Sequence, residues 1–171
     1  DLLERQRHAL VDLSTITTRA ESLKELLTGS LEVILNFMSL NVGNIFLYHP
    51  DTEEVIIEAQ RNIPPKLLER VRIQKVGLKE VGVASRSAFE RRPILIEDLP
   101  KSPLITYAID AIREAKLKTL GSFPLLAGTE LVGVLQVIST EERSFSADDL
   151  SLLNLMSDQL AYSIKKNQIE E

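Results

Sequence analysis

Two pairs of strand-like segments, separated by a helical stretch and flanked by helices, constrain this chain most strongly. The first pair covers residues 44–48 and 55–60, joined by His49-Pro50-Asp51-Thr52, whose proline and aspartate favour a turn. The second pair covers residues 119–126 and 131–139, joined by a short turn that contains glycine. Hairpins that share one sheet pair antiparallel and place helices on the faces of the sheet. We therefore predict an α+β fold built on a central antiparallel sheet.

Both ends of the chain are predicted to be helical. The first residues carry apolar side chains at heptad-like spacing, and Ser22 stands three positions before Glu25, the spacing of a capping box. We therefore expect two helices, or one bent helix, with the second over residues 23–40. Ser146 stands three positions before Asp149 in the same way and predicts the start of a last helix.

The stretch between the hairpins is predicted to hold short helices and one brief strand. Proline is tolerated in the first turn of a helix, so each Pro in this stretch that precedes an apolar pattern favours a helix start. The predicted helices cover residues 65–72 and 82–91 and a segment that opens at Ser102-Pro103, and the predicted strand covers residues 94–96.

Composition and motifs argue against several classes of function. The net charge of -5 disfavours nucleic-acid binding, which needs clustered positive charge. The absence of cysteine excludes disulfides and thiol chemistry, and neither His8 nor His49 has a partner at metal-ligand spacing. No nucleophile elbow or phosphate-binding loop is present. We predict no catalytic residue, no metal and no cofactor, so the chain is not expected to be an enzyme.

The chain is expected to be a cytoplasmic piece of a longer protein. No apolar run approaches the roughly 18 residues of a membrane span, and no secretory signal is visible, so no membrane partner is predicted. The first residue is Asp1 rather than methionine, and both ends read as unfinished helices.

The segment over residues 82–98 resembles the middle of a GAF domain. That family shows a Gly-x-Ala-Gly run, a helix, a Gly-x-Pro, a short strand and an aspartate. Ser85 and Arg91 stand where the family usually has glycine. Four positions match the pattern: Gly82, Ala84, Pro93 and Asp98.

The later part of the chain is also similar to GAF domains. The matching residues are Ser122-Phe-Pro124-Leu125, Gly128, Leu131-Val-Gly133-Val-Leu135 and Arg143-Ser-Phe145-Ser-x-x-Asp149-Leu-x-Leu-Leu153. The resemblance implies terminal helices on one face of the sheet and short helices and loops over a small-ligand pocket on the other. It divides the chain into a signalling helix at residues 1–21, the GAF domain at 22–165, and the start of a linker helix at 166–171.

GAF domains bind different ligands, and the resemblance narrows the choice. Some members bind cyclic nucleotides, tetrapyrroles or haem, and some reduce free methionine sulfoxide. The reductase activity and phytochrome-like tetrapyrrole attachment use cysteines, which this sequence lacks. Phe145 and Asp149 keep the spacing of the cyclic-nucleotide pattern, but Leu150 replaces its glutamate and no Asn-Lys pair matches. Cyclic GMP is therefore not the expected ligand.

The ligand-binding residues are predicted by their places in this pattern. Phe46, Ile112 and Phe123 fit plain core positions better than ligand contacts, because alternating strand residues bury one face anyway. Asp98 likewise fits a turn cap better than a ligand contact. Tyr107 is the best candidate for a polar contact, because its ring can pack while its hydroxyl reaches a ligand. The full predicted set is Phe46, Tyr48, Ile96, Asp98, Tyr107, Ile112, Ser122 and Phe123.

We expect a regulatory domain that binds a small molecule within a larger signal-transduction protein, such as a sensor kinase, a cyclic-dinucleotide enzyme or a transcription activator. The alternative is a ligand-free dimerisation and relay domain. One helix buries one stripe against its own sheet, so the remaining stripe is expected to pair in a homodimeric four-helix bundle. The predicted interface residues are Leu13, Ile16, Ala20, Leu153, Met156 and Leu160.

Overall fold

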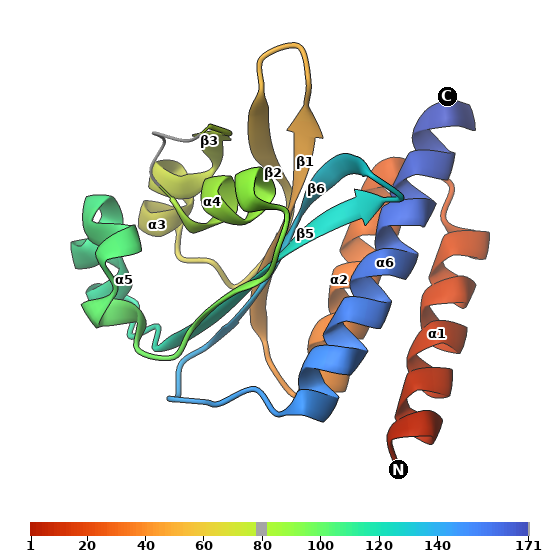
Figure 1. The fold of residues 1–171 in the computed structure, drawn as a ribbon, viewed down its shortest axis with the longest axis horizontal. Coiled ribbons are helices and arrows are strands. Elements are labelled where there is room, and N and C mark those ends of the chain that lie inside the picture. Colours follow the sequence, from red (N-terminus) through yellow and green to blue (C-terminus); the bar gives the residue numbers. More distant parts are fainter. Residues whose placement is uncertain (78–81, 171) are drawn as a thin grey trace.

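A computed structural model describes residues 1–77 and 82–170 and places six strands in one antiparallel sheet (Figure 1). The strand order is β3-β2-β1-β6-β5-β4, so the two hairpins meet at the centre, where β1 pairs with β6. This arrangement confirms the predicted α+β fold with a central antiparallel sheet.

The strands are β1 (Val42–His49), β2 (Glu54–Arg61), β3 (Ile73–Lys75), β4 (Ile94–Ile96), β5 (Thr119–Ala127) and β6 (Glu130–Ser139). The α-helices are α1 (Leu2–Arg19), α2 (Leu23–Met38), α3 (Pro65–Val71), α4 (Val83–Glu90), α5 (Ile109–Glu114) and α6 (Ala147–Glu170). Two 3₁₀ segments, η1 (Leu99–Lys101) and η2 (Pro103–Ala108), precede α5.

The helix starts follow the local signals in the sequence. The hydroxyl of Ser22 accepts a hydrogen bond from the backbone N–H of Glu25 at 3.1 Å, which begins α2 and separates it from α1. Ser146 and Asp149 form a reciprocal pair: each backbone N–H donates to the other's side chain, at 3.2 and 3.0 Å. The predicted reciprocal cap is confirmed at Ser146 and Asp149. At Ser22 only the hydroxyl half of the predicted box forms, because the Glu25 carboxylate accepts from the backbone N–H of Glu21 at 2.8 Å instead.

The middle of the chain differs from the prediction in two places. β3 was not predicted; here the backbone carbonyl of Arg72 accepts from Ile57 N–H at 2.9 Å, and residues 73–75 then pair with β2. The helix expected after Ser102 is instead η2 followed by α5, with non-helical backbone angles at Ile105 (φ -124°, ψ 20°). Tertiary pairing and this kink override the apolar periodicity of the segment.

The two faces of the sheet carry separate cores. On one face α2 and α6 lie against the sheet, and α1 packs outside them as a further layer, as Figure 1 shows. On the other face α3, α4, α5 and the 3₁₀ segments cover the sheet. Strand side chains alternate between these cores: Ile45 and Leu47 face the long helices, whereas Phe46 lies under α4.

The six residues predicted to form a dimer interface are engaged within the chain. α6 is sandwiched between the sheet and α1, so it buries two apolar rows without a second copy. The premise that one helix buries one stripe therefore fails here. Leu13, Leu153, Met156 and Leu160 are at most 1 % exposed, and Ile16 and Ala20 pack against the same core.

Two polar contacts join α1 to α6 in this layer. The hydroxyls of Thr17 and Ser163 lie 3.1 Å apart, and Arg5 pairs with Asp149 at 3.8 Å.

Within the described residues, no helix combines the length and apolar character needed to cross a membrane.

Candidate functional site

A small cavity lies between the sheet and the short helices that cover it. Its volume is about 30 Å³, and ten apolar side chains, among them Ile63, Ile105 and Ile138, form most of its wall. One water molecule needs a cavity volume of about 10–15 Å³, so this cavity has room for about two waters. Its volume is far below the roughly 300 Å³ or more of a typical ligand pocket. The remaining lining residues are Asn44, Gln74, Tyr107 and Gln136.

Two buried amides form the polar floor of the cavity. Asn44 on β1 and Gln136 on β6 are directly opposite in the sheet and are 1 % and 5 % exposed. Asn44 Nδ2 donates to Gln136 Oε1 at 3.2 Å, and Gln136 Nε2 donates to the hydroxyl of Ser122 at 3.2 Å. Ser122 then contacts the hydroxyl of Ser87 on α4 at 2.8 Å. A continuous polar chain therefore joins the cavity floor to α4.

The cavity is covered by α3, α4, α5 and the two 3₁₀ segments, which we call the cover, and Gln74 on β3 joins α3 to α4 within it. Gln74 Oε1 accepts from the backbone N–H of Ser85 at 3.1 Å, and Gln74 Nε2 donates to the carbonyl of Val71 at 3.0 Å. Gly82 adopts φ +114°, and a β-carbon there would lie 2.3 Å from Gln74 Oε1, so glycine is required at this matched family position. Burial raises the pKa of Tyr107 to about 12, so its hydroxyl stays protonated at neutral pH.

Two exposed ion pairs tie the cover together across its outer surface. Arg70 on α3 contacts Asp110 on α5 at 2.5 Å, and Lys66 contacts Glu114 at 3.1 Å. A hydrogen bond and the charge of Arg70 lower the pKa of Asp110. The charged carboxylate is thus favoured when α3 and α5 are in place.

We expect the ion pair between Arg70 and Asp110 to weaken in acid. The pKa of Asp110 is lower in the folded chain than in the unfolded chain. The contribution of its ionised carboxylate to folding stability is therefore present at pH values above the unfolded pKa and is lost as the pH falls through the folded pKa. In Arg70→Ala the pKa of Asp110 should rise toward its ordinary range, as measured by carbon-detected NMR titration. Lys66→Ala, which removes the neighbouring pair, serves as the control, and an equal rise there would show that Arg70 is not the cause.

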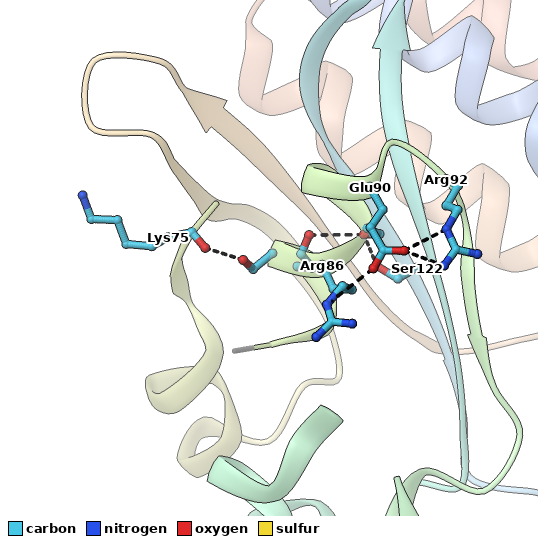
Figure 2. A network of polar contacts seen from close by, with 8 residues as sticks. Lys75, Arg86, Glu90, Arg92 and Ser122 are labelled. Carbon is cyan, nitrogen blue, oxygen red and sulfur yellow. Dashed lines mark hydrogen bonds and ion pairs between the residues drawn. The ribbon is translucent and has the colours of Figure 1, made fainter. Parts of the chain in front are cut away.

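A second set of polar contacts surrounds α4, as shown in Figure 2. Glu90 lies between Arg86 and Arg92, at 3.4 and 2.5 Å. The helix ends at Arg91, which adopts φ +57°, the left-handed conformation that favours the glycine usual at this family position. The Arg91 guanidinium donates to the carbonyl of Thr129 in the β5–β6 turn. α4 is thereby joined to the tip of the second hairpin.

Of the predicted ligand-binding residues, Tyr107 and Ile112 line the cavity. Phe46 and Tyr48 face the same side of the sheet but lie farther along β1, packed with α4. Ser122 lies behind Gln136 and reaches the cavity through it.

The other predicted positions lie elsewhere. Phe123 packs in the core under the long helices, because neighbouring residues of a strand point to opposite faces and Ser122 occupies the cavity side. Ile96 is buried beside the cavity without lining it. Asp98 is partly exposed and pairs with Lys101 at 3.8 Å.

The sequence analysis missed Asn44, Gln74 and Gln136 as site residues. Gln136 carried a visible signal, since it interrupts the apolar run from Leu131 to Ile138. A buried amide in a central strand needs hydrogen-bond partners, so such an interruption marks a polar site inside the core.

A family model described as GAF domain matches residues 20–165, most of the chain. The chain belongs to the GAF domain family. The resemblance drawn from residues 82–98 and from the second hairpin is therefore confirmed. GAF domains are regulatory and sensory domains that occur in kinases, phosphotransferases and phytochromes. No curated protein matches the sequence significantly.

Solved GAF structures share the fold at low sequence identity. The GAF domain of a phosphoenolpyruvate-protein phosphotransferase from Coxiella burnetii has a TM-score of 0.83 at 16% identity, covering 98% of this chain and 96% of that one. The structure of free methionine-R-sulfoxide reductase from Neisseria meningitidis, in complex with its substrate, has a TM-score of 0.78 at 13% identity, covering 97% of this chain and 92% of that one. The phycocyanobilin-bound GAF domain of a cyanobacterial phytochrome has a TM-score of 0.68 at 16% identity, covering 97% of each chain.

Proposed function

We propose that this GAF domain senses a small molecule in the cavity beneath α3, α4 and α5 and regulates a larger signalling protein without catalysing a reaction. The observation that carries the proposal is the pair of buried amides, Asn44 and Gln136, at the floor of a mostly apolar cavity. Burying a polar atom costs free energy unless it is hydrogen-bonded. The two amides bond to each other and to Ser122, but among the described residues Asn44 Oδ1 has no partner. A ligand that fills the cavity would recover that cost.

The proposed ligand enters when the cover moves away from the sheet. The cavity of about 30 Å³ is too small for an organic molecule, whereas the cover consists of short helices and 3₁₀ segments. Such segments have few internal hydrogen bonds and open at lower free energy than the central sheet.

The proposed signal leaves through α4 and α6. The polar chain from Asn44 reaches Ser87 on α4, and Arg91 at the end of α4 binds the β5–β6 turn at Thr129. The next residue, Glu130 at the start of β6, pairs with Lys165 of α6 at 2.7 Å. Movement of α4 would therefore change contacts near the C-terminal end of α6.

A ligand-free relay is the second candidate, and the small volume of the cavity favours it. In that case the cover stays closed and the domain transmits strain between its terminal helices. The absence of cysteine disfavours a thiol-based reductase activity.

A thermal-shift screen of metabolites separates these two functions. A ligand that binds the folded state at a hundredfold excess over its Kd stabilises it by about 2.7 kcal/mol. For a domain of this size that raises Tm by roughly 5–10 °C. Tyr107→Ala should abolish the shift, because it removes the ring that closes the cavity.

Tyr162→Ala is the matched control, since this tyrosine is 60 % exposed on α6, away from the cavity. It should leave the ligand-dependent shift unchanged. A broad metabolite screen in which no compound raises Tm would support the ligand-free relay instead. Turnover abolished by Tyr107→Ala would overturn the regulatory proposal.

A further inference from the structure

The lining of the cavity sets the charge of a matching ligand. Among the residues that the structure describes, the cavity wall contains no Asp, Glu, Lys, Arg or His. A charged molecule would therefore lose its hydration without gaining an opposite charge, which is prohibitively costly in an apolar cavity.

The direction of the polar chain sets which hydrogen-bonding group faces the ligand. The carbonyl of Ala84 can only accept, so the hydroxyl of Ser87, 3.2 Å away, donates to it. Ser87 then accepts from Ser122, whose oxygen in turn accepts from Gln136 Nε2. Gln136 Oε1 is left to accept from Asn44 Nδ2.

This order leaves the carbonyl oxygen of Asn44 as the free end of the chain. Asn44 Oδ1 is buried and, within the described part of the chain, has no hydrogen-bond partner. Asn44 is one of the residues that line the cavity. A buried acceptor without a donor costs free energy, so a molecule that supplies an N–H or O–H at this point gains what the protein alone lacks.

We propose that the cavity selects an uncharged molecule with an apolar body and an N–H or O–H donor directed at Asn44 Oδ1. The inference rests on the proposed function as a sensor and specifies the chemical class of its ligand. Tyr107, which belongs to η2, also lines the cavity, and its hydroxyl would serve as a second polar contact for the same molecule. Primary amides and hydroxylated rings meet these requirements, whereas carboxylates and ammonium groups do not.

Matched fragments test the proposal. Each set has one shape in three forms: a primary amide, a methyl ketone and a carboxylate, such as benzamide, acetophenone and benzoate. Titrations are followed by NMR on the labelled methyl groups of Ile63, Ile105 and Ile138, which line the cavity. We expect amides to bind at least about tenfold more tightly than ketones, because a site with a buried acceptor rejects the analogue that lacks the donor. Carboxylates should not bind.

Asn44→Leu combined with Gln136→Leu should bring the amide-to-ketone ratio close to one, while ketone binding persists. The second change is needed because Asn44→Leu alone would leave Gln136 Oε1, which accepts from Asn44 Nδ2, as a new free acceptor at the cavity floor. Asn41→Leu, an exposed asparagine three residues earlier, is the control and should keep the ratio. The ratio for the unmodified chain decides the matter even if the double variant does not fold.

The outcomes separate this inference from the sensor function. Fragments that shift the cavity methyl signals without an amide preference, or carboxylates that bind best, overturn the donor inference and leave the sensor proposal standing. If no fragment in any set shifts these signals, the cavity does not open to ligands, and the sensor proposal fails together with the inference.

Discussion

Gly133→Ala is expected to destabilise the domain by about 3 kcal/mol, at the upper end of what overpacking costs. A β-carbon added at Gly133 on β6 would lie 2.1 Å from the backbone carbonyl oxygen of Phe46 on β1. Backbone within a paired strand cannot move aside as a flexible side chain can, so the two central strands would have to separate. In a domain of this size the loss lowers Tm by roughly 6–12 °C, measurable by circular dichroism.

The change should also disturb the cavity floor. Asn44 and Gln136 lie on the same two strands, a few residues from Gly133, and their hydrogen bond depends on the strand register. Gly128→Ala is the control, because it lies at φ +64° in the β5–β6 turn with nothing within 4 Å of the added carbon. It should cost only the left-handed backbone strain, about 1–2 kcal/mol. Equal losses in the two variants would mean that β1 and β6 tolerate separation at Gly133.

The elements that local signals specify could be predicted from the sequence. The Ser22 and Ser146 caps act within three residues, and the hairpins are fixed by their turns. β3 could not be predicted in this way, because its strand conformation depends on pairing with β2. The position of α1 outside α2 and α6 could not be predicted either, because it is decided by packing between segments that are far apart in the chain.

The candidate site was only partly predictable for the same reason. Tyr107 and Ile112 were found through the family pattern and do line the cavity. The amide pair was missed, because Asn44 and Gln136 are 92 residues apart and become neighbours only through the register of β1 and β6. Phe123 shows the converse: strand alternation excludes it from the face that Ser122 occupies.

Leu13→Glu is expected to release α1 from the domain. Leu13 is 1 % exposed in the core between α1, α2 and α6, and an unpaired carboxylate there costs several kcal/mol. Detachment of α1 avoids that cost while the sheet and the helices against it remain folded, because α1 contacts the helices rather than the strands. Hydrogen exchange of the α1 amides should then accelerate at least about a hundredfold, equivalent to roughly 2.7 kcal/mol of lost protection.

Val11→Glu is the matched control, because Val11 is on the same helix but 52 % exposed. Exposed substitutions usually change the free energy of unfolding by less than about 0.5 kcal/mol, so α1 should keep its protection. Light scattering on both variants also addresses the predicted homodimer. A Leu13→Glu chain that stays fully protected and only changes from dimer to monomer would mean that Leu13 faces a second copy, as the sequence stripe suggested. A dimer disrupted by Val11→Glu instead would place the contact on the outer face of α1, where side chains remain exposed after the chain has folded.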